Sequence, residues 1–271
     1  MIGQENLRRF FSDKYVSSHK PMPKSMMFIG AKGSGKKTFI KWLSDLSDIP
    51  IVETGQKAED IRLLSEMCYN SVKMTMYLIP DVEQMSAIAQ NSLLKILEEP
   101  PVNTILILTV AQENTVLPTI TSRCVKFYMD KYSESELLQY SRGIHQSNGE
   151  FDELMLKICV CPGDIDLLFS QDISEFQTYV KRVFNNIAKV TGANSFKIGN
   201  KINLSDENKK FDLGLFWRAF ISECFENVNT DQKYLKGVVI TQKYLQELRV
   251  KGINKQMLFD CWILDIRKEW L

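Results

Sequence analysis

Short apolar runs that alternate with amphipathic stretches restrict the fold of this chain more than any other feature. The clearest run is TILILTV at residues 104–110, which is continuously β-branched and apolar. Such a run is typical of a strand inside a parallel sheet, where both faces are covered. Further strands are expected at residues 26–29, 51–52, 74–79 and 125–129. Because helical spacing fills the segments between them, the sequence predicts a doubly wound α/β domain over residues 1–129.

Beyond this domain the pattern becomes helical. Ser133 is followed three residues later by Glu136, which is the pattern of a capping box at the start of a helix. Helical periodicity then continues toward the end of the chain, and it predicts a small helical domain over residues 130–172 and a larger one over residues 173–271. The polar stretch at residues 191–210 is expected to be a loop or linker.

Composition and charge limit the class of protein. Hydrophobic residues at 44%, charged residues at 25% and a formal net charge of +1 are ordinary for a soluble globular protein, and they argue against a chain that is basic throughout. The apolar runs are too short to span a bilayer, and the opening MIGQENLRRFF has no apolar signal core. We therefore expect a cytoplasmic protein with no membrane partner. The six cysteines lack zinc-ligand spacing and are expected to be free thiols.

A glycine-rich turn, GAKGSGKKT at residues 30–38, joins the first expected strand to the first expected helix. Gly30, Gly33 and Gly35 supply a permissive backbone, and Lys36 supplies a positive charge. Backbone N–H groups in such a turn point toward an anion, and the helix dipole adds to the attraction. The sequence therefore predicts a phosphate-binding loop.

Hydrolysis of a nucleoside triphosphate also needs a magnesium site. The ion is held by a hydroxyl directly after the lysine and by an acidic residue at the end of another strand. Here the residue after the lysine is Lys37, whose ammonium group cannot ligate a metal ion, and Thr38 comes about 100° further around the helix. After the strand at 74–79 the chain offers Pro80 and then Asp81, and periodicity alone does not decide which residue occupies the metal position.

Two longer segments carry a family resemblance. Residues 76–101, MYLIPDVEQMSAIAQNSLLKILEEPP, resemble the bacterial clamp-loader ATPases of the AAA+ class, in which a strand ending in Asp-Glu precedes Ala-Asp-Lys-Met and Asn-x-Leu-Leu-Lys-x-Leu-Glu-Glu-Pro-Pro. Residues 104–127 resemble the next element of that family, a sensor strand followed by Leu-Pro-x-Ile-x-Ser-Arg-Cys. IGQE at residues 2–5 resembles the N-terminal signature that lies beside the nucleotide base. The matching residues are Met85, Asn91, Leu93, Leu94, Lys95, Leu97, Glu98, Glu99, Pro100, Pro101, Leu117, Pro118, Ile120, Ser122, Arg123 and Cys124.

The resemblance implies an AAA+ fold with three parts: a nucleotide-binding-like α/β domain, a small helical lid and an all-α collar. Its gapless register places Pro80 at the metal-holding aspartate and Asp81 at the catalytic glutamate. Lys37 and Pro80 therefore replace both magnesium-holding side chains. The zinc module of many relatives is also absent from the segment that follows the first helix.

The sensor positions depart from the family as well. Thr109 is followed by Val-Ala-Gln where active members usually carry an asparagine, and the Gly-x-x-Arg sensor becomes Gly163 to Asp166. We expect a site that is inactive or nearly so, with no required cofactor, no metal and weak or no binding of ATP. Two interpretations of Lys36 stay open: it retains weak affinity for phosphate or ADP, or it is a relic held at a helix N-terminus.

The arginine of Ser-Arg-Cys in this family points into the ATP site of the next subunit. The resemblance implies that Arg123 is an arginine finger that acts in trans, whereas the residue alone would be an ordinary surface arginine. A guanidinium can neutralise a γ-phosphate bidentately, and such fingers contribute about 10³–10⁵ in rate. The implied partners are the other subunits of a hetero-oligomeric ring and, through that complex, the sliding clamp and primer–template DNA.

Two other functions compete with this one. An active ATPase with an unusual metal site, in which Asp81 or Glu83 is the ligand, stays open as the alternative. A small-molecule kinase with a phosphate loop is disfavoured because it leaves LPTITSRC at residues 117–124 unexplained. The large apolar side chains of the last helices are expected in a core, and the resemblance adds a collar that holds the ring together. These side chains include Phe216, Trp217, Phe220 and Phe225.

Overall fold

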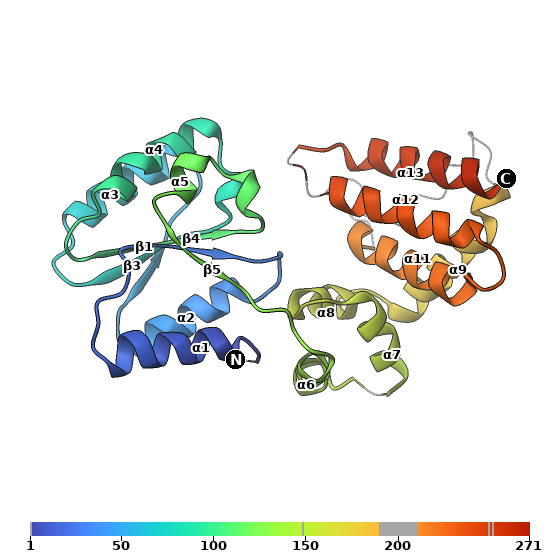
Figure 1. Cartoon of the computed structure of the whole chain (residues 1–271), viewed down its shortest axis with the longest axis horizontal. Helices are drawn as coiled ribbons and strands as arrows, with labels where there is room; N and C mark the ends of the chain where they lie inside the picture. Colours follow the sequence, from blue (N-terminus) through green and yellow to red (C-terminus); the bar gives the residue numbers. More distant parts are fainter. Residues whose placement is uncertain (1, 148, 190–210, 249, 251) are drawn as a thin grey trace. The chain divides into compact units, whose positions relative to one another are not determined.

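The computed structural model describes residues 2–147, 149–189, 211–248, 250 and 252–271. Within the chain, two compact units form, the first from Met1–Gln139 with Cys161–Gly163 and the second from Tyr140–Val160 with Asp164–Leu271 (Figure 1). The three-domain division at residues 129 and 172 stays a prediction. The linker predicted at residues 191–210 lies outside the described residues.

The first unit is built on a five-stranded parallel sheet in the order β2-β3-β4-β1-β5. The strands are β1 (Ser25–Ile29), β2 (Ile51–Glu53), β3 (Thr75–Ile79), β4 (Thr104–Val110) and β5 (Val125–Tyr128). Every residue of β1, β3 and β4 is buried, as the continuous apolar runs predicted. The α/β class predicted from the alternation is therefore confirmed.

Helices cover both faces of this sheet. In the first unit they are α1 (Glu5–Phe11), α2 (Lys36–Ser47), α3 (Ala58–Tyr69), α4 (Ala87–Glu98) and α5 (Pro118–Thr121), with a π-helix η1 (Ser12–Ser17) and two 3₁₀ turns, η2 (Val82–Gln84) and η3 (Glu113–Thr115). α1 and α2 lie on one side of the sheet, and α3, α4 and α5 lie on the other (Figure 1). Because side chains alternate along a strand, Met27 and Ile29 join the core on the α3–α4 side, whereas Met26 and Phe28 join the core on the α1–α2 side.

The loops that follow β1, β3 and β4 all leave the same, carboxyl-terminal edge of the sheet. In open α/β sheets this edge is where ligands bind. The three loops begin at Gly30, Pro80 and Ala111, so the phosphate loop and both candidate magnesium positions come from one edge. The parallel topology alone brings these distant segments together.

The described part of the remaining chain is helical. The helices are α6 (Glu134–His145), α7 (Gly149–Ile158), α8 (Pro162–Phe169), α9 (Ile173–Asn186), the 3₁₀ turn η4 (Ile187–Lys189), α11 (Leu213–Asn227), α12 (Lys233–Glu247) and α13 (Lys255–Trp270). Ser133 and Glu136 form the predicted capping box, since the Glu136 carboxylate accepts from the Ser133 N–H at 2.7 Å and the Ser133 hydroxyl oxygen accepts from the Glu136 N–H at 3.3 Å. Among the described residues, none of the helices has the length and apolar character needed to cross a membrane.

The core of the second unit is aromatic. Phe216, Trp217 and Phe220 are fully buried, as predicted, and the Phe220 ring meets the Trp262 ring edge-on at 4.9 Å between centroids. The prediction that Phe225 is a core residue is wrong, because its side chain is 53% exposed. Nine residues separate it from Phe216, and at roughly 100° per residue this places the two on opposite sides of α11.

α12 begins at Lys233 and has Gly237 near its start. Glycine is a poor helix former, so Gly237 weakens the sequence signal for the first turns of this helix. The structure gives the reason for the glycine. A Cβ at this position would lie 2.8 Å from Cζ2 of Trp270 and 3.2 Å from Sγ of Cys224, so only glycine leaves room for the indole.

Candidate functional site

The phosphate loop between β1 and α2 has the glycines that its backbone requires. Gly33 and Gly35 adopt φ angles of 81° and 80°, which are strained for residues with a side chain. Gly30 is required for space, since a Cβ there would lie 2.7 Å from Cγ of Met129 and 2.8 Å from Oγ of Ser34. The three glycines singled out in the sequence therefore each have a structural role in one turn.

Lys36 folds back onto this loop. Its ammonium group donates to the carbonyl oxygens of Gly30 at 2.5 Å and Ala31 at 2.9 Å, and the residue is only 7% exposed. Burial lowers the pKa of Lys36, while the carboxylates of Asp81 and Glu83 act in the opposite direction. The lysine thus supplies a charge inside the loop, and loop carbonyls and nearby carboxylates compensate that charge.

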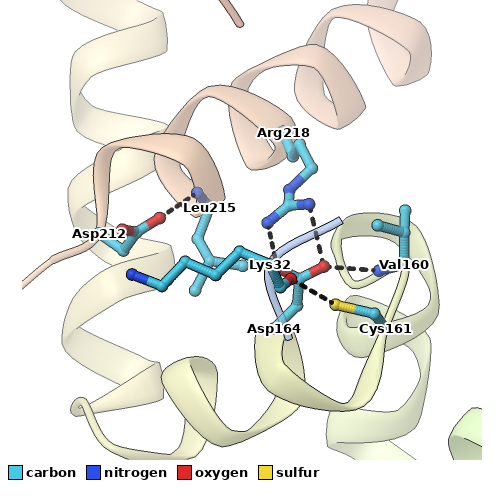
Figure 2. A network of polar contacts seen from close by, with 7 residues as sticks. All are labelled: Lys32, Val160, Cys161, Asp164, Asp212, Leu215 and Arg218. Atoms are coloured by element: carbon cyan, nitrogen blue, oxygen red, sulfur yellow. Dashed lines mark hydrogen bonds and ion pairs between the residues drawn. The ribbon is translucent and has the colours of Figure 1, made fainter. Parts of the chain in front are cut away.

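Residues 161–163, which belong to the first unit, pack against the same loop. The Gly163 N–H donates to the Gly33 carbonyl at 3.1 Å, and the Cys161 thiol donates to the Lys32 carbonyl at 3.4 Å (Figure 2). The two backbones touch: a Cβ on Gly163 would lie 2.4 Å from Cα of Gly33. The loop is therefore held by a segment that lies far from it in the sequence.

Tyr132, which the sequence did not single out, holds the other end of the loop, and Gln4 of the IGQE signature binds the segment that carries this tyrosine. The Tyr132 hydroxyl donates to the Ser34 carbonyl at 3.0 Å, and burial raises the pKa of this phenol. The side-chain amide of Gln4 pairs with the Asp130 backbone, donating to its carbonyl at 2.9 Å and accepting from its N–H at 2.7 Å. Gln4 is the third residue of the IGQE signature, and this pairing ties the signature to the segment that carries Tyr132.

The resemblance places Lys37 and Pro80 where relatives hold magnesium, and neither residue has a side chain that ligates this ion. Lys37 forms an ion pair with Glu53 at 2.5 Å, and both side chains are about half exposed. Pro80 offers only its carbonyl, which accepts from the Gln56 amide at 3.0 Å. Asp81, next along, has a φ of 46°, and its N–H donates to the hydroxyl oxygen of Thr109 at 3.0 Å.

Glu83 is a further carboxylate at this edge of the sheet. Its Oε1 accepts from the Ala111 N–H at 2.9 Å, which joins the turn after β3 to the end of β4. Its Oε2 is buried, and no hydrogen-bond partner for it occurs within the described part of the chain. Glu83 also acts to raise the pKa of Lys36, so its carboxylate contributes to the electrostatic environment of the phosphate loop.

Arg123 lies beyond α5, in a segment that apolar neighbours fix. Ile120 and Cys124 are buried, and burial raises the pKa of the Cys124 thiol to about 12. The Arg123 side chain between them points outward and is 33% exposed. Its guanidinium donates to the Thr119 carbonyl at 2.7 Å and to Oε1 of Glu98 at 2.6 Å.

Gln90 links the arginine-bearing segment to the turn after β3. Its side chain is buried, accepts from the Leu117 N–H at 3.1 Å and donates to the Val82 carbonyl at 3.2 Å. Both neighbours belong to motifs recognised in the sequence, but the glutamine that connects them lies at an unremarked position of α4. The sequence signal that could have identified Gln90 is a polar residue on the buried face of an amphipathic helix, because a buried polar group needs a hydrogen-bond partner.

The carboxylates of the altered Gly-x-x-Arg motif bind within the second unit. Asp164 accepts from both terminal nitrogens of Arg218, at 3.0 and 2.7 Å, and from the Val160 N–H at 3.0 Å (Figure 2). Asp166, which stands at the position of the family's arginine, accepts from the Tyr140 hydroxyl at 3.0 Å and pairs with the His145 ring at 2.9 Å. Both aspartates thus have helix-packing partners.

Comparison with known proteins relates this chain to subunits of DNA polymerase III. A family model described as "DNA polymerase III, delta subunit" matches residues 44–133. The chain is 25% identical over 246 residues to DNA polymerase III subunit gamma/tau of Mycoplasma genitalium, covering 78% of this chain and 39% of that protein. It is 49% identical over 49 residues to DNA polymerase III subunit delta' of Bacillus subtilis, covering 18% of this chain and 15% of that protein. The chain therefore spans well under half the length of these relatives.

Solved structures share the fold of this chain. A DNA polymerase III gamma subunit-related protein from Thermotoga maritima superposes with a TM-score of 0.53 at 16% identity, covering 98% of each chain. Thermotoga maritima RuvB, a Holliday junction branch migration motor, superposes with a TM-score of 0.52 at 14% identity, covering 84% of this chain and 76% of that one. These likenesses concern the fold. The fold is that of AAA+ proteins, and the family model together with the polymerase III relatives supports a subunit of the clamp-loader type.

Proposed function

We propose that this chain is a delta-prime-type subunit of a DNA polymerase III clamp loader that hydrolyses no ATP itself and supplies Arg123 to a neighbour's ATP site. The observation that carries the proposal is the pair Lys37 and Pro80 at the two positions that should hold magnesium. Lys37 is engaged with Glu53, and Pro80 has no side-chain donor. Without a hydroxyl and an acid to hold a divalent cation, the loop cannot neutralise charge on a transferring phosphoryl group.

The arginine finger is the part of the machinery that the chain retains. Arg123 is outward-facing and partly exposed, and buried Ile120 and Cys124 fix the backbone on either side of it. A finger acts by placing its planar, permanently charged group against the γ-phosphate of a bound nucleotide. In this proposal the nucleotide, its magnesium ion and the attacking water belong to the adjacent subunit. The other subunits of a hetero-oligomeric ring are the direct partners, and the sliding clamp and primer–template DNA are reached through that ring.

The experiment that tests the finger is reconstitution of the complex with Arg123→Ala. We expect DNA-dependent ATP hydrolysis at the neighbouring site to fall by about 10³-fold or more, the range known for such fingers. Arg123→Lys keeps the charge but loses the bidentate geometry, so it should restore little activity. Arg9→Ala is the control, because Arg9 is an exposed arginine whose side chain is 87% accessible. An unchanged rate with Arg123→Ala in a fully assembled complex would show that the assignment is wrong.

The alternative is an active ATPase that holds magnesium through Asp81 or Glu83. Two observations favour it: Oε2 of Glu83 has no hydrogen-bond partner among the residues that the structure describes, and both carboxylates influence Lys36. If it holds, the unmodified chain hydrolyses ATP, and Glu83→Gln or Asp81→Asn abolishes that activity. In the proposal favoured here, the unmodified chain is inactive, and only the restored pair Lys37→Thr with Pro80→Asp gains magnesium-dependent binding of ATP.

A further inference from the structure

Glu98 binds the guanidinium of Arg123 within the same chain. The two side chains approach to 2.6 Å, and they are 52% and 33% exposed. A second donor of Arg123 is held by the Thr119 carbonyl at 2.7 Å. The residue proposed to serve a neighbouring subunit therefore already has a carboxylate ligand of its own.

The position of Glu98 makes this pairing more than a chance surface contact. Glu98 is the last residue of α4, where the negative end of the helix dipole disfavours a carboxylate. Glu99 follows directly, so two negative charges stand at this helix end. Arg123 is the one cation shown bound to Glu98 within the described residues. The positive charge of Arg123 thus stabilises a carboxylate that the helix dipole destabilises.

A carboxylate and a phosphate compete for the same donors. A guanidinium has five N–H groups and binds planar or tetrahedral oxyanions through parallel pairs of them. Thr119 and Glu98 already occupy one donor on each terminal nitrogen. The negative charge of Glu98 also repels an approaching triphosphate.

We propose that Glu98 is an intramolecular latch for the arginine finger, a carboxylate that binds Arg123 in cis until the neighbour's triphosphate displaces it. This inference rests on the proposed role of Arg123 in trans. An exposed ion pair of this kind shifts an equilibrium by up to about fivefold, so the latch is weak and readily reversed. Glu98 is a positioning residue: it acts through the arginine that it binds, and it sets how readily that arginine is released.

The experiment compares Glu98→Gln with Glu99→Gln in the reconstituted complex. Glu99 is the matched control because it is the adjacent, exposed carboxylate at the same helix end, and its substitution changes the net charge equally. With Glu98→Gln we expect the KM for Mg-ATP in DNA-dependent hydrolysis to fall about two- to fivefold, with a smaller change in kcat. Raising the salt concentration should shrink this difference from the unmodified complex, because salt screens exposed pairs.

Other outcomes separate the latch from the proposed function. If Arg123→Ala slows hydrolysis but Glu98→Gln behaves like Glu99→Gln, the latch is refuted and the finger stands. If Glu98→Gln raises KM, Glu98 holds the arginine in its productive position and the latch is likewise refuted. If Arg123→Ala has no effect, the proposed function itself fails. In the Arg123→Ala background, Glu98→Gln should change nothing, because the group it restrains is gone.

Discussion

Replacing Gly163 with alanine should separate residues 161–163 from the phosphate loop. The new Cβ would lie 2.4 Å from Cα of Gly33 and 3.2 Å from its carbonyl oxygen. Both neighbours are backbone atoms and cannot rotate away. Overpacking of this kind costs about 1–3 kcal/mol. Loss of the hydrogen bond from the Gly163 N–H to the Gly33 carbonyl adds about 0.5–1.5 kcal/mol, so we expect a total of about 1.5–4.5 kcal/mol.

Native-state hydrogen exchange on the full-length chain measures this cost locally. Backbone amides of residues 33–36 should exchange faster in Gly163→Ala, by a factor corresponding to the free energy lost, while amides of β4 change less. Gly143→Ala is the control: Gly143 lies in α6 with nothing within 4 Å of the added Cβ, so alanine there should be neutral or stabilising. If Gly163→Ala leaves exchange at residues 33–36 as it is in the unmodified chain, the packing of the 161–163 segment on the loop is refuted.

Two further predictions concern the cores. Gly237→Ala places a Cβ 2.8 Å from Cζ2 of Trp270, and this overpacking should lower the free energy of unfolding by about 1–3 kcal/mol. That cost outweighs the roughly 1 kcal/mol gain in helix propensity, so thermal unfolding should show a lower Tm, and a rise in Tm would contradict this packing. Burial raises the pKa of the Cys124 thiol to about 12, so iodoacetamide at pH 8 should alkylate half-buried Cys261 well before Cys124 in the folded chain. Peptide mapping measures the order of alkylation, and equal rates would argue against the burial of Cys124.

The sequence alone predicts those parts of the fold that depend on residues close together in the chain. Continuous apolar runs identified β1, β3 and β4, because a strand covered on both faces needs no polar break. The GxxxxGK spacing identified the phosphate loop, because the glycines are required within a single turn. α1 was not anticipated: its N-cap residue Gln4 has a φ of 60°, and none of the usual capping side chains marks the start of the helix.

The parts of the site that were not anticipated depend on residues far apart in the sequence. Gln4 pairs with Asp130, and the role of the glutamine appears only once the fold has brought β5 to the start of the chain. Glu98 and Arg123 were both recognised as parts of family motifs, yet nothing in either motif indicates that they form an ion pair. Such contacts follow from the packing of α4 against α5, which periodicity does not encode.

Phe225 illustrates the opposite error. Its aromatic side chain suggests the core, but the helical register of α11 turns it outward while Phe216 and Phe220 point inward. Residue type is a weaker guide than register wherever a helix carries apolar residues on more than one side.

Titration of the isolated chain with ATP, in magnesium and then in EDTA, tests the central claim most directly. Because the proposal places Lys37 and Pro80 at the metal positions, isothermal titration calorimetry should show weak or no binding, and any binding that remains should be the same in EDTA as in magnesium. A parallel assay should detect no release of phosphate. Tight ATP binding that EDTA abolishes, accompanied by turnover comparable to that of active clamp-loader ATPases, would contradict the account.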